Sequence, residues 1–199
     1  MNVKPSTWRF NHLLINDINA SQNPNIIKAL EELNAFLINE RINISTIIEI
    51  GTLNGGFTSI LAESDLSKGT KIHTFDIRDK QLGCLDKYNN VFFHKEDVFS
   101  TNTIVDLLKS DGNCLLFCDG GNKINEFNLY SNNLKKNDFI FCHDYVTNKE
   151  LFEEQYRNKI WNWHESNYEA IELAILKNNL ENVLPEFFEP AVWASYRKK

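Results

Sequence analysis

The chain has 199 residues, of which 42% are hydrophobic and 12% aromatic, and its formal net charge is −6. This composition argues for a globular protein and against a disordered one, and the charge argues against a nucleic-acid partner. The apolar runs are too short to cross a bilayer, and residues 1–20 lack the core of a signal peptide. We therefore expect one domain over residues 1–199, with no membrane partner.

The four cysteines show neither the spacing of a metal site nor that of a disulfide framework. They are Cys84, Cys114, Cys118 and Cys142. Three of them lie in predicted buried strands, where a thiol behaves as a small hydrophobic group. We expect a reducing, cytoplasmic compartment.

Residues 1–22 carry aromatic and aliphatic side chains without a clear period. They predict either a flap over the site or a segment packed against the domain. A helix is predicted next, because Asn23 is a good N-cap residue and Pro24 suits the first helical position. Apolar residues then follow at helical spacing to about Arg41.

Residues 46–59 predict a strand, a glycine turn and a helix in that order. The β-branched run over residues 47–50 is typical of a strand that is buried on both faces. Gly51, Gly55 and Gly56 follow, and glycines let the backbone turn sharply close to a ligand. The start of the next helix offers free N–H groups, so this order predicts a nucleotide-type site. Leu53 stands where a dinucleotide fingerprint has its second glycine, which disfavours NAD.

Four further strands alternate with helices near residues 72, 92, 115 and 139. This alternation predicts right-handed βαβ units and one parallel sheet, whose ligands bind beyond the carboxyl ends of the strands. Polar residues collect at those ends, namely Glu49, Asp76, Asp97, Asp119, His143 and Asp144. Asp76 is placed to accept two hydrogen bonds from a ribose diol; the alternative is that it caps the following turn.

Residues 145–199 are less regular and form the variable part of the chain. Helices are predicted over residues 151–160 and 168–176, and two strands over 183–188 and 191–196. The two strands predict an antiparallel hairpin at one sheet edge. Trp161, Trp163 and His164 lie between the two helices and predict either a substrate pocket or aromatic packing.

The motif Glu-x-Gly-x-x-x-Gly-Gly at residues 49–56 resembles motif I of class I S-adenosylmethionine-dependent methyltransferases. Together with Gln22-Asn23-Pro24, Asp119-Gly120 and His143-Asp144-Tyr145, it is similar to the cephalosporin hydroxylase and macrolide sugar O-methyltransferase group. The resemblance covers about residues 20–146. It implies an α/β, Rossmann-like fold with a mostly parallel seven-stranded sheet, flanking helices and a reversed last strand.

The resemblance also implies roles for individual residues. The glycine loop would hold the amino-acid part of S-adenosyl-L-methionine, and the acid after the third strand would meet the adenine amino group. The cofactor-binding residues are then Glu49, Gly51, Thr52, Asn54, Gly55, Gly56, Asp76, Asp97 and Asp119. The group often places a divalent cation after strands four and five, which implies Mg²⁺ on Asp119 and Asp144, with His143 as a further ligand. Otherwise His143 is the catalytic base, acting with Asp119.

Two residues depart from the pattern of the group. Asn122 stands near the position of a histidine, and Phe57 replaces a small hydroxyl residue after the paired glycines. We expect a methyltransferase that acts on a hydroxyl oxygen of a small molecule or sugar. A homodimer of the chain is a further possibility. Two alternatives stay open: a cofactor-binding fold that has lost catalysis and serves as an interaction subunit, and an NAD-dependent oxidoreductase.

Overall fold

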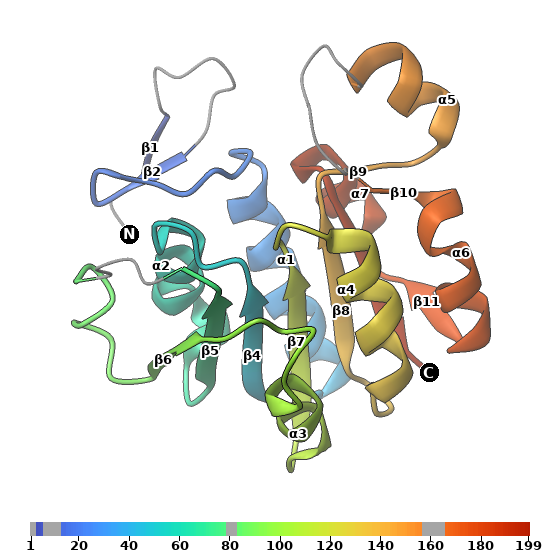
Figure 1. Ribbon diagram of the computed structural model, residues 1–199. Coiled ribbons are helices and arrows are strands. Elements are labelled where there is room, and N and C mark those ends of the chain that lie inside the picture. Colours follow the sequence, from blue (N-terminus) through green and yellow to red (C-terminus); the bar gives the residue numbers. More distant parts are fainter. Residues whose placement is uncertain (1–2, 6–12, 79–82, 157–165) are drawn as a thin grey trace.

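The computed structural model describes residues 3–5, 13–78, 83–156 and 166–199 (Figure 1). Seven strands form one sheet in the order β11-β12-β8-β7-β4-β5-β6. Their bounds are β4 (Ile44–Ile50), β5 (Lys71–Asp76), β6 (Val91–Lys95), β7 (Asn113–Cys118), β8 (Phe139–His143), β11 (Leu180–Asn182) and β12 (Trp193–Lys198). Neighbouring strands from β8 to β6 are parallel, whereas β12 runs antiparallel to both β8 and β11. The predicted Rossmann-like sheet with a reversed last strand is confirmed.

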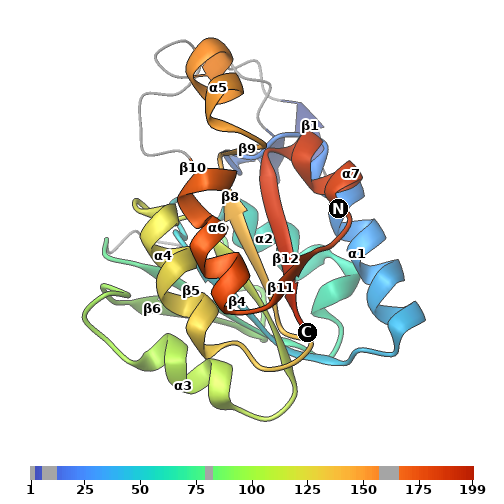
Figure 2. The same ribbon diagram turned by 90° about the vertical axis from the view of Figure 1, so that its right-hand side faces the viewer.

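Helices cover both faces of the sheet, because successive strand residues point to opposite sides. One face is covered by α1 (Ile26–Glu40), α2 (Gly56–Glu63) and α7 (Pro185–Phe188), and the other by α3 (Thr103–Lys109), α4 (Lys123–Tyr130) and α6 (Tyr168–Lys177). Figure 2 shows α4 and α6 on one side, and α1 and α7 on the other. In β7, Leu115 and Phe117 pack toward the first group, and Leu116 and Cys118 toward the second. This two-sided burial explains the unbroken apolar runs of the central strands.

Shorter elements lie beyond the carboxyl ends of the parallel strands (Figure 1). A small antiparallel sheet is formed by β1 (Val3–Pro5), β2 (Leu13–Ile15) and β3 (Ile18–Asn19). The others are β9 (Tyr145–Val146), which pairs with β10 (Ser166–Asn167), and α5 (Lys149–Leu151), which continues as a π-helical turn over Phe152–Tyr156. Leu13 and Ile15 belong to the same core as α1 and α2, so this part of the N-terminal segment packs against the main sheet's helices.

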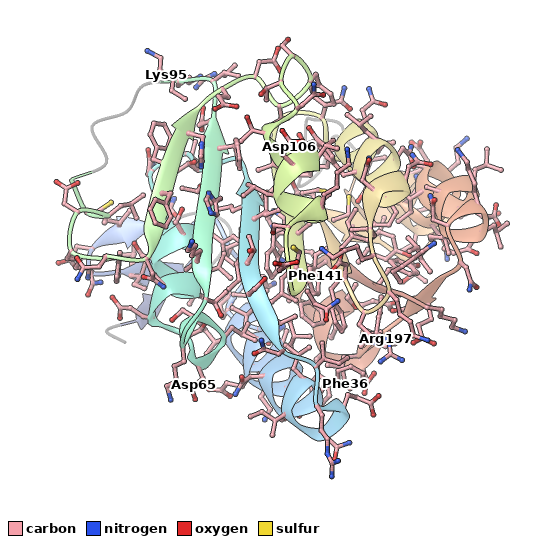
Figure 3. All side chains as sticks on the ribbon, turned by 90° about the horizontal axis from the view of Figure 1, so that it is seen from below. Phe36, Asp65, Lys95, Asp106, Phe141 and Arg197 are labelled. Atoms are coloured by element: carbon pink, nitrogen blue, oxygen red, sulfur yellow. The ribbon has the colours of Figure 1, made fainter. Side chains whose placement is uncertain are left out.

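At the opposite end of the sheet, Arg197 of β12 connects the last two strands to α1. Its guanidinium Nε donates to Glu181 Oε1 of β11 at 2.6 Å, and its Cζ lies 5.5 Å from the ring centre of Phe36 of α1. Figure 3, a view from below, shows Phe36 and Arg197 at this end. The last two strands are thereby tied to the first helix.

The predicted strand over residues 183–188 is wrong. That stretch forms α7 and leads into a 3₁₀ turn (Glu189–Ala191), while the paired strands are β11 and β12. Pro185 explains the difference, because it lacks an N–H and its fixed φ suits the first turn of a helix, where it stands. The antiparallel pair at the sheet edge is present, with a longer connection than predicted.

Two smaller predictions also need correction. The first helix starts at Ile26, and Asn25 is its N-cap residue; the Asn23 side chain instead accepts the Asn25 N–H at 2.9 Å, in the turn before it. The helix predicted over residues 151–160 is a short α-helix and a π-turn up to Tyr156, and its remainder lies outside the described residues.

All four cysteines are free, and the three predicted to be buried are buried. Among the described residues, no helix has the length and hydrophobicity to cross a membrane.

Candidate functional site

Four neighbouring strands bring acidic and imidazole groups together at their carboxyl ends. Glu49 is the penultimate residue of β4, Asp76 ends β5, Asp119 follows β7, and His143 ends β8. The carboxylates of Asp76 and Asp119 both act electrostatically on Glu49. The structure therefore gathers these predicted site residues around the glycine loop, at the edge where α/β sheets bind ligands.

The glycine loop, residues 51–56, turns with positive φ at Gly51 (+100°) and Gly55 (+76°). A Cβ atom on Gly51 would lie 2.3 Å from the carbonyl oxygen of Asp119, and one on Gly56 would lie 2.4 Å from the Cα of Ala20. A side chain at Gly51 would therefore strain the turn and collide with the end of the neighbouring strand β7.

Hydrogen bonds to β5 hold this loop in place. The N–H groups of Gly51 and Thr52 donate to the Phe75 carbonyl at 2.8 and 3.1 Å. The N–H of Leu53 donates to one oxygen of Asp76 at 2.9 Å, and the N–H of Arg78 donates to the other at 2.9 Å. Asp76 thus caps backbone turns, and each of its oxygens can still accept a second bond from a ligand hydroxyl.

Glu49 lies fully buried beneath the loop. Its Oε2 accepts hydrogen bonds from the hydroxyls of Thr58 at 2.5 Å and Thr74 at 2.6 Å, and the Thr52 hydroxyl lies 2.6 Å from that of Thr74. Its Oε1 is buried and has no hydrogen-bond partner in the described part of the chain. Burial raises the pKa of Glu49 to about 8, and the nearby charge of Asp119 adds to the effect. The carboxyl group is therefore mostly protonated at neutral pH.

Asp119 and His143 form a hydrogen-bonded pair that two further side chains hold. His143 Nδ1 lies 2.7 Å from Asp119 Oδ1, and Gln22 Nε2 donates to Asp119 Oδ2 at 2.8 Å. Gln22 Oε1 in turn accepts the indole N–H of Trp193 at 2.9 Å. The Trp193 ring stacks on His143, with 4.5 Å between ring centres. Because Nδ1 donates its proton to a carboxylate, we assign the neutral tautomer with its lone pair on Nε2.

The environment of His143 favours proton uptake. Burial alone would lower its pKa, but the carboxylates of Asp119 and Asp144 more than offset this, and the pKa is raised. The Nε2 atom is buried and lacks a hydrogen-bond partner among the residues described here. An oriented imidazole whose lone pair is available to accept a proton has the chemistry of a general base.

Asp144 follows His143 and forms an ion pair that the sequence had not indicated. Lys123, the first residue of α4, places its Nζ 3.0 Å from Asp144 Oδ2, and only 12% of the lysine side chain is exposed. Burial lowers the pKa of Lys123, but Asp144 and Asp119 outweigh it, so the net pKa is raised and the ammonium stays charged.

Asp119, His143 and Asp144 each offer one ligand atom, and these atoms lie within 4.8 Å of one another, so the group could hold a metal ion. Carboxylate oxygens are suitable ligands for Mg²⁺. However, Asp119 accepts from Gln22 and His143, and Asp144 accepts from the Lys123 ammonium. The ligand atoms are present but already form these bonds, and a metal ion would have to displace the buried Lys123 ammonium. As arranged, this set does not fit Mg²⁺.

The remaining predicted residues have local partners. Asp97 is exposed and accepts the Phe99 N–H and the Ser100 hydroxyl, both at 3.0 Å. Asn54 is exposed in the loop, and its carbonyl accepts a weak bond from Cys84 Sγ at 3.6 Å. The contacts of Asp97 and Asn54 with a cofactor stay predictions.

The residues after Asp119 show the part that Asn122 plays in the fold. Asn122 is the N-cap residue of α4, and its side chain accepts the Asn125 N–H. Buried Glu126 accepts the N–H groups of Gly120 and Asn122 at 3.1 and 3.2 Å, and burial raises its pKa to about 7. These bonds fix the backbone between β7 and α4.

Sequence reasoning missed Lys123 and gave no role to Gln22 or Trp193. One signal was available for Lys123, because a lysine at a helix start opposes the helix dipole and needs nearby acids. The partners of Gln22 lie 97 and 171 positions away and left no local signal. The cluster of Trp161, Trp163 and His164 lies outside the described residues.

Similar folds occur in solved structures. The apo structure of CmcI, a cephalosporin hydroxylase, matches with a TM-score of 0.62 and 16% identity, over 98% of this chain and 76% of that one. The Mg-SAM structure of CmcI gives 0.56 and 15%, over 98% and 77%. The CurJ carbon methyltransferase gives 0.55 and 11%, over 86% and 53%. No protein-family model matches the chain, and no curated protein matches its sequence. At these identities the likeness establishes the fold, which is that of class I methyltransferases.

Proposed function

We propose that this chain is an S-adenosylmethionine-dependent methyltransferase that methylates a hydroxyl oxygen of a small molecule or sugar. One observation carries the proposal: the Asp119–His143 pair lies at the same sheet edge as the glycine loop and Asp76. A base and a nucleotide-type loop are thereby combined in one place. The methyltransferase fold supports this assignment, and Leu53 in the loop argues against NAD.

The residues around the loop fit this cofactor. Asp76 would accept the ribose hydroxyls, and residues 51–56 would enclose the amino-acid part. The buried Glu49 Oε1, which lacks a partner among described residues, leaves one polar atom beneath the loop for a ligand or water. Asp97 would accept a hydrogen bond from the adenine amino group, in exchange for one of its present bonds to Phe99 N–H or the Ser100 hydroxyl. S-adenosylmethionine supplies a methyl group that a sulfonium has already activated.

The protein's own part in the reaction is to position the acceptor and remove its proton. His143 Nε2 would accept the hydroxyl proton as the oxygen takes the methyl group. Asp119 holds the ring through Nδ1 and stabilises the positive imidazolium that results. Gln22 keeps Asp119 in place, and Trp193 supports the ring by stacking.

Calorimetry with S-adenosylmethionine, its demethylated product and NAD tests this proposal. We expect the first two to bind and NAD not to bind. A screen of sugar and phenolic acceptors should then reveal methyl transfer that is lost in His143→Gln. Binding without transfer to any acceptor would favour the interaction subunit, and binding of NAD alone would favour the oxidoreductase.

A further inference from the structure

The charge balance at the ends of β7 and β8 is the feature that carries a new inference. Asp119 and Asp144 bring two carboxylates together. Asp119 accepts hydrogen bonds from Gln22 and His143, which are neutral donors, and Asp144 forms an ion pair with Lys123. Two like charges at such an edge need a compensating positive charge. In many oxygen-rich sites that charge is a divalent cation.

Here the chain supplies the charge itself. The Lys123 ammonium lies 3.0 Å from Asp144 Oδ2, and Asp144 Oδ1 lies 3.8 Å from His143 Nδ1. The lysine side chain is 12% exposed and that of Asp144 is 21% exposed, so water screens this pair weakly. Lys123 also begins α4, whose amino-terminal dipole adds positive potential at the same place.

The backbone around the pair is fixed from several sides. The Lys123 carbonyl lies 3.7 Å from Cys142 Sγ, and the Asp144 carbonyl accepts the Ser166 N–H at 2.9 Å. Glu126 holds the turn that leads into α4. If Lys123 swung away, its ion pair with the partly buried Asp144 would be lost.

We propose that Lys123 takes the place of a divalent cation, so that the site works without metal. Lys123 is a positioning residue: it neutralises Asp144 and leaves Asp119 to orient His143. The proposal rests on the proposed function for its catalytic consequence, but its central claim concerns metal affinity and can be measured without cofactor or acceptor.

The test is a titration of the purified chain with Mn²⁺, followed by the electron paramagnetic resonance signal of the free ion, with Mg²⁺ calorimetry alongside. The wild type and Lys123→Arg should show no saturable site up to about 1 mM, the range of weak oxygen sites. Lys123→Met keeps the chain length but removes the charge. It should gain a site with at least about tenfold higher affinity, because the ammonium that offsets the charge of the two carboxylates is then gone. Asp144→Asn added to Lys123→Met should remove that site.

Lys68→Met is the matched control, because Lys68 pairs with Asp65 at a similar 2.8 Å but on the surface, where the side chains are 78% and 66% exposed. It should leave metal binding unchanged. Lys123→Gln serves as a second variant if Lys123→Met does not fold, as judged by circular dichroism.

Two results of the titration would overturn the proposal. One is a saturable site in the wild type that Asp144→Asn abolishes, and the other is no gain of binding in either folded Lys123 variant. Methyl transfer, once an acceptor is known, should be unchanged by a chelator, and its loss there would also overturn the proposal. Failure to bind S-adenosylmethionine would count against the proposed function alone, since the Mn²⁺ titration is independent of it.

Discussion

Glu49 is a buried acid whose protonation couples stability to pH. Its pKa is raised from 4.5 to about 8, so the folded state binds a proton that the unfolded state releases between these values. The unfolding free energy should therefore fall as pH rises from about 4.5 to about 8, by about 1.4 kcal/mol per pKa unit or on the order of 4 kcal/mol in all. Glu49→Gln mimics the protonated form and should remove this loss.

Thermal melts of the two proteins at pH 5 and pH 8 measure the effect. The melting temperatures should be close at pH 5, whereas at pH 8 the variant should melt higher by roughly 8–16 °C. Glu126 and the other titrating groups are common to both proteins, so their contributions cancel in the difference. A constant difference across this pH range would mean that Glu49 ionises normally.

A second prediction concerns Asp76 and the affinity for the cofactor. Asp76→Ala should weaken S-adenosylmethionine binding by about 1.5–3 kcal/mol, the usual range for hydrogen bonds to a charged group, or roughly 10- to 150-fold in Kd. Part of the loss comes from the loop, because the Leu53 N–H loses its acceptor. Asp65→Ala is the control, since Asp65 follows α2 at the far end of that helix from the loop (Figure 3). Equal affinities in calorimetry would remove Asp76 from the site.

The turn between β4 and α2 depends on close approach rather than on positive φ alone. Gly51 and Gly69 both have positive φ, +100° and +75°, but a Cβ on Gly51 would meet the Asp119 carbonyl at 2.3 Å, whereas one on Gly69 meets nothing within 4 Å. Gly69→Ala should cost about 1–2 kcal/mol from backbone strain. Gly51→Ala should cost roughly 1–3 kcal/mol more, because two strand ends must separate. Urea unfolding of both variants gives the comparison, and equal losses would show that the turn has room for a side chain.

The central parallel strands β4, β7 and β8 could be predicted because each is a short apolar run that the sheet buries on both faces, whereas β5 and β6 are partly exposed and followed from their alternation with helices. The polar ends could be predicted from the direction of the strands, since an acid at the end of a parallel strand, such as Asp76 or Asp119, must lie at the carboxyl end of the sheet. The strand predicted over residues 183–188 failed because its apolar residues suit either a strand or a short helix, and Pro185 decided for the helix. Lys123 and Gln22 could not be placed, because their partners are fixed by the order of strands and not by local pattern.

At the largest scale, the site is held by contacts between distant parts of the chain. Gln22, just before α1, bridges Asp119 after the central strand β7 and Trp193 at the start of β12. Gln22 and Trp193 are completely buried, so an unmade bond in this group cannot be replaced by water. The N-terminal segment, the middle of the sheet and its last strand therefore meet at the proposed base, His143.

This link predicts that Gln22 and Trp193 are energetically coupled. Gln22→Met keeps the size of the side chain but removes the donor to Asp119 Oδ2 and the acceptor of the Trp193 indole N–H. We expect a loss of about 2–4 kcal/mol in the free energy of unfolding. Trp193→Phe removes the indole donor alone and should cost about 1–3 kcal/mol, in part from lost packing on His143. In the double variant the indole bond is lost only once, so the total should fall short of the sum by about 0.5–3 kcal/mol. Urea unfolding of the four proteins completes the cycle, and strictly additive losses would show that the bridge does not couple the two ends of the chain.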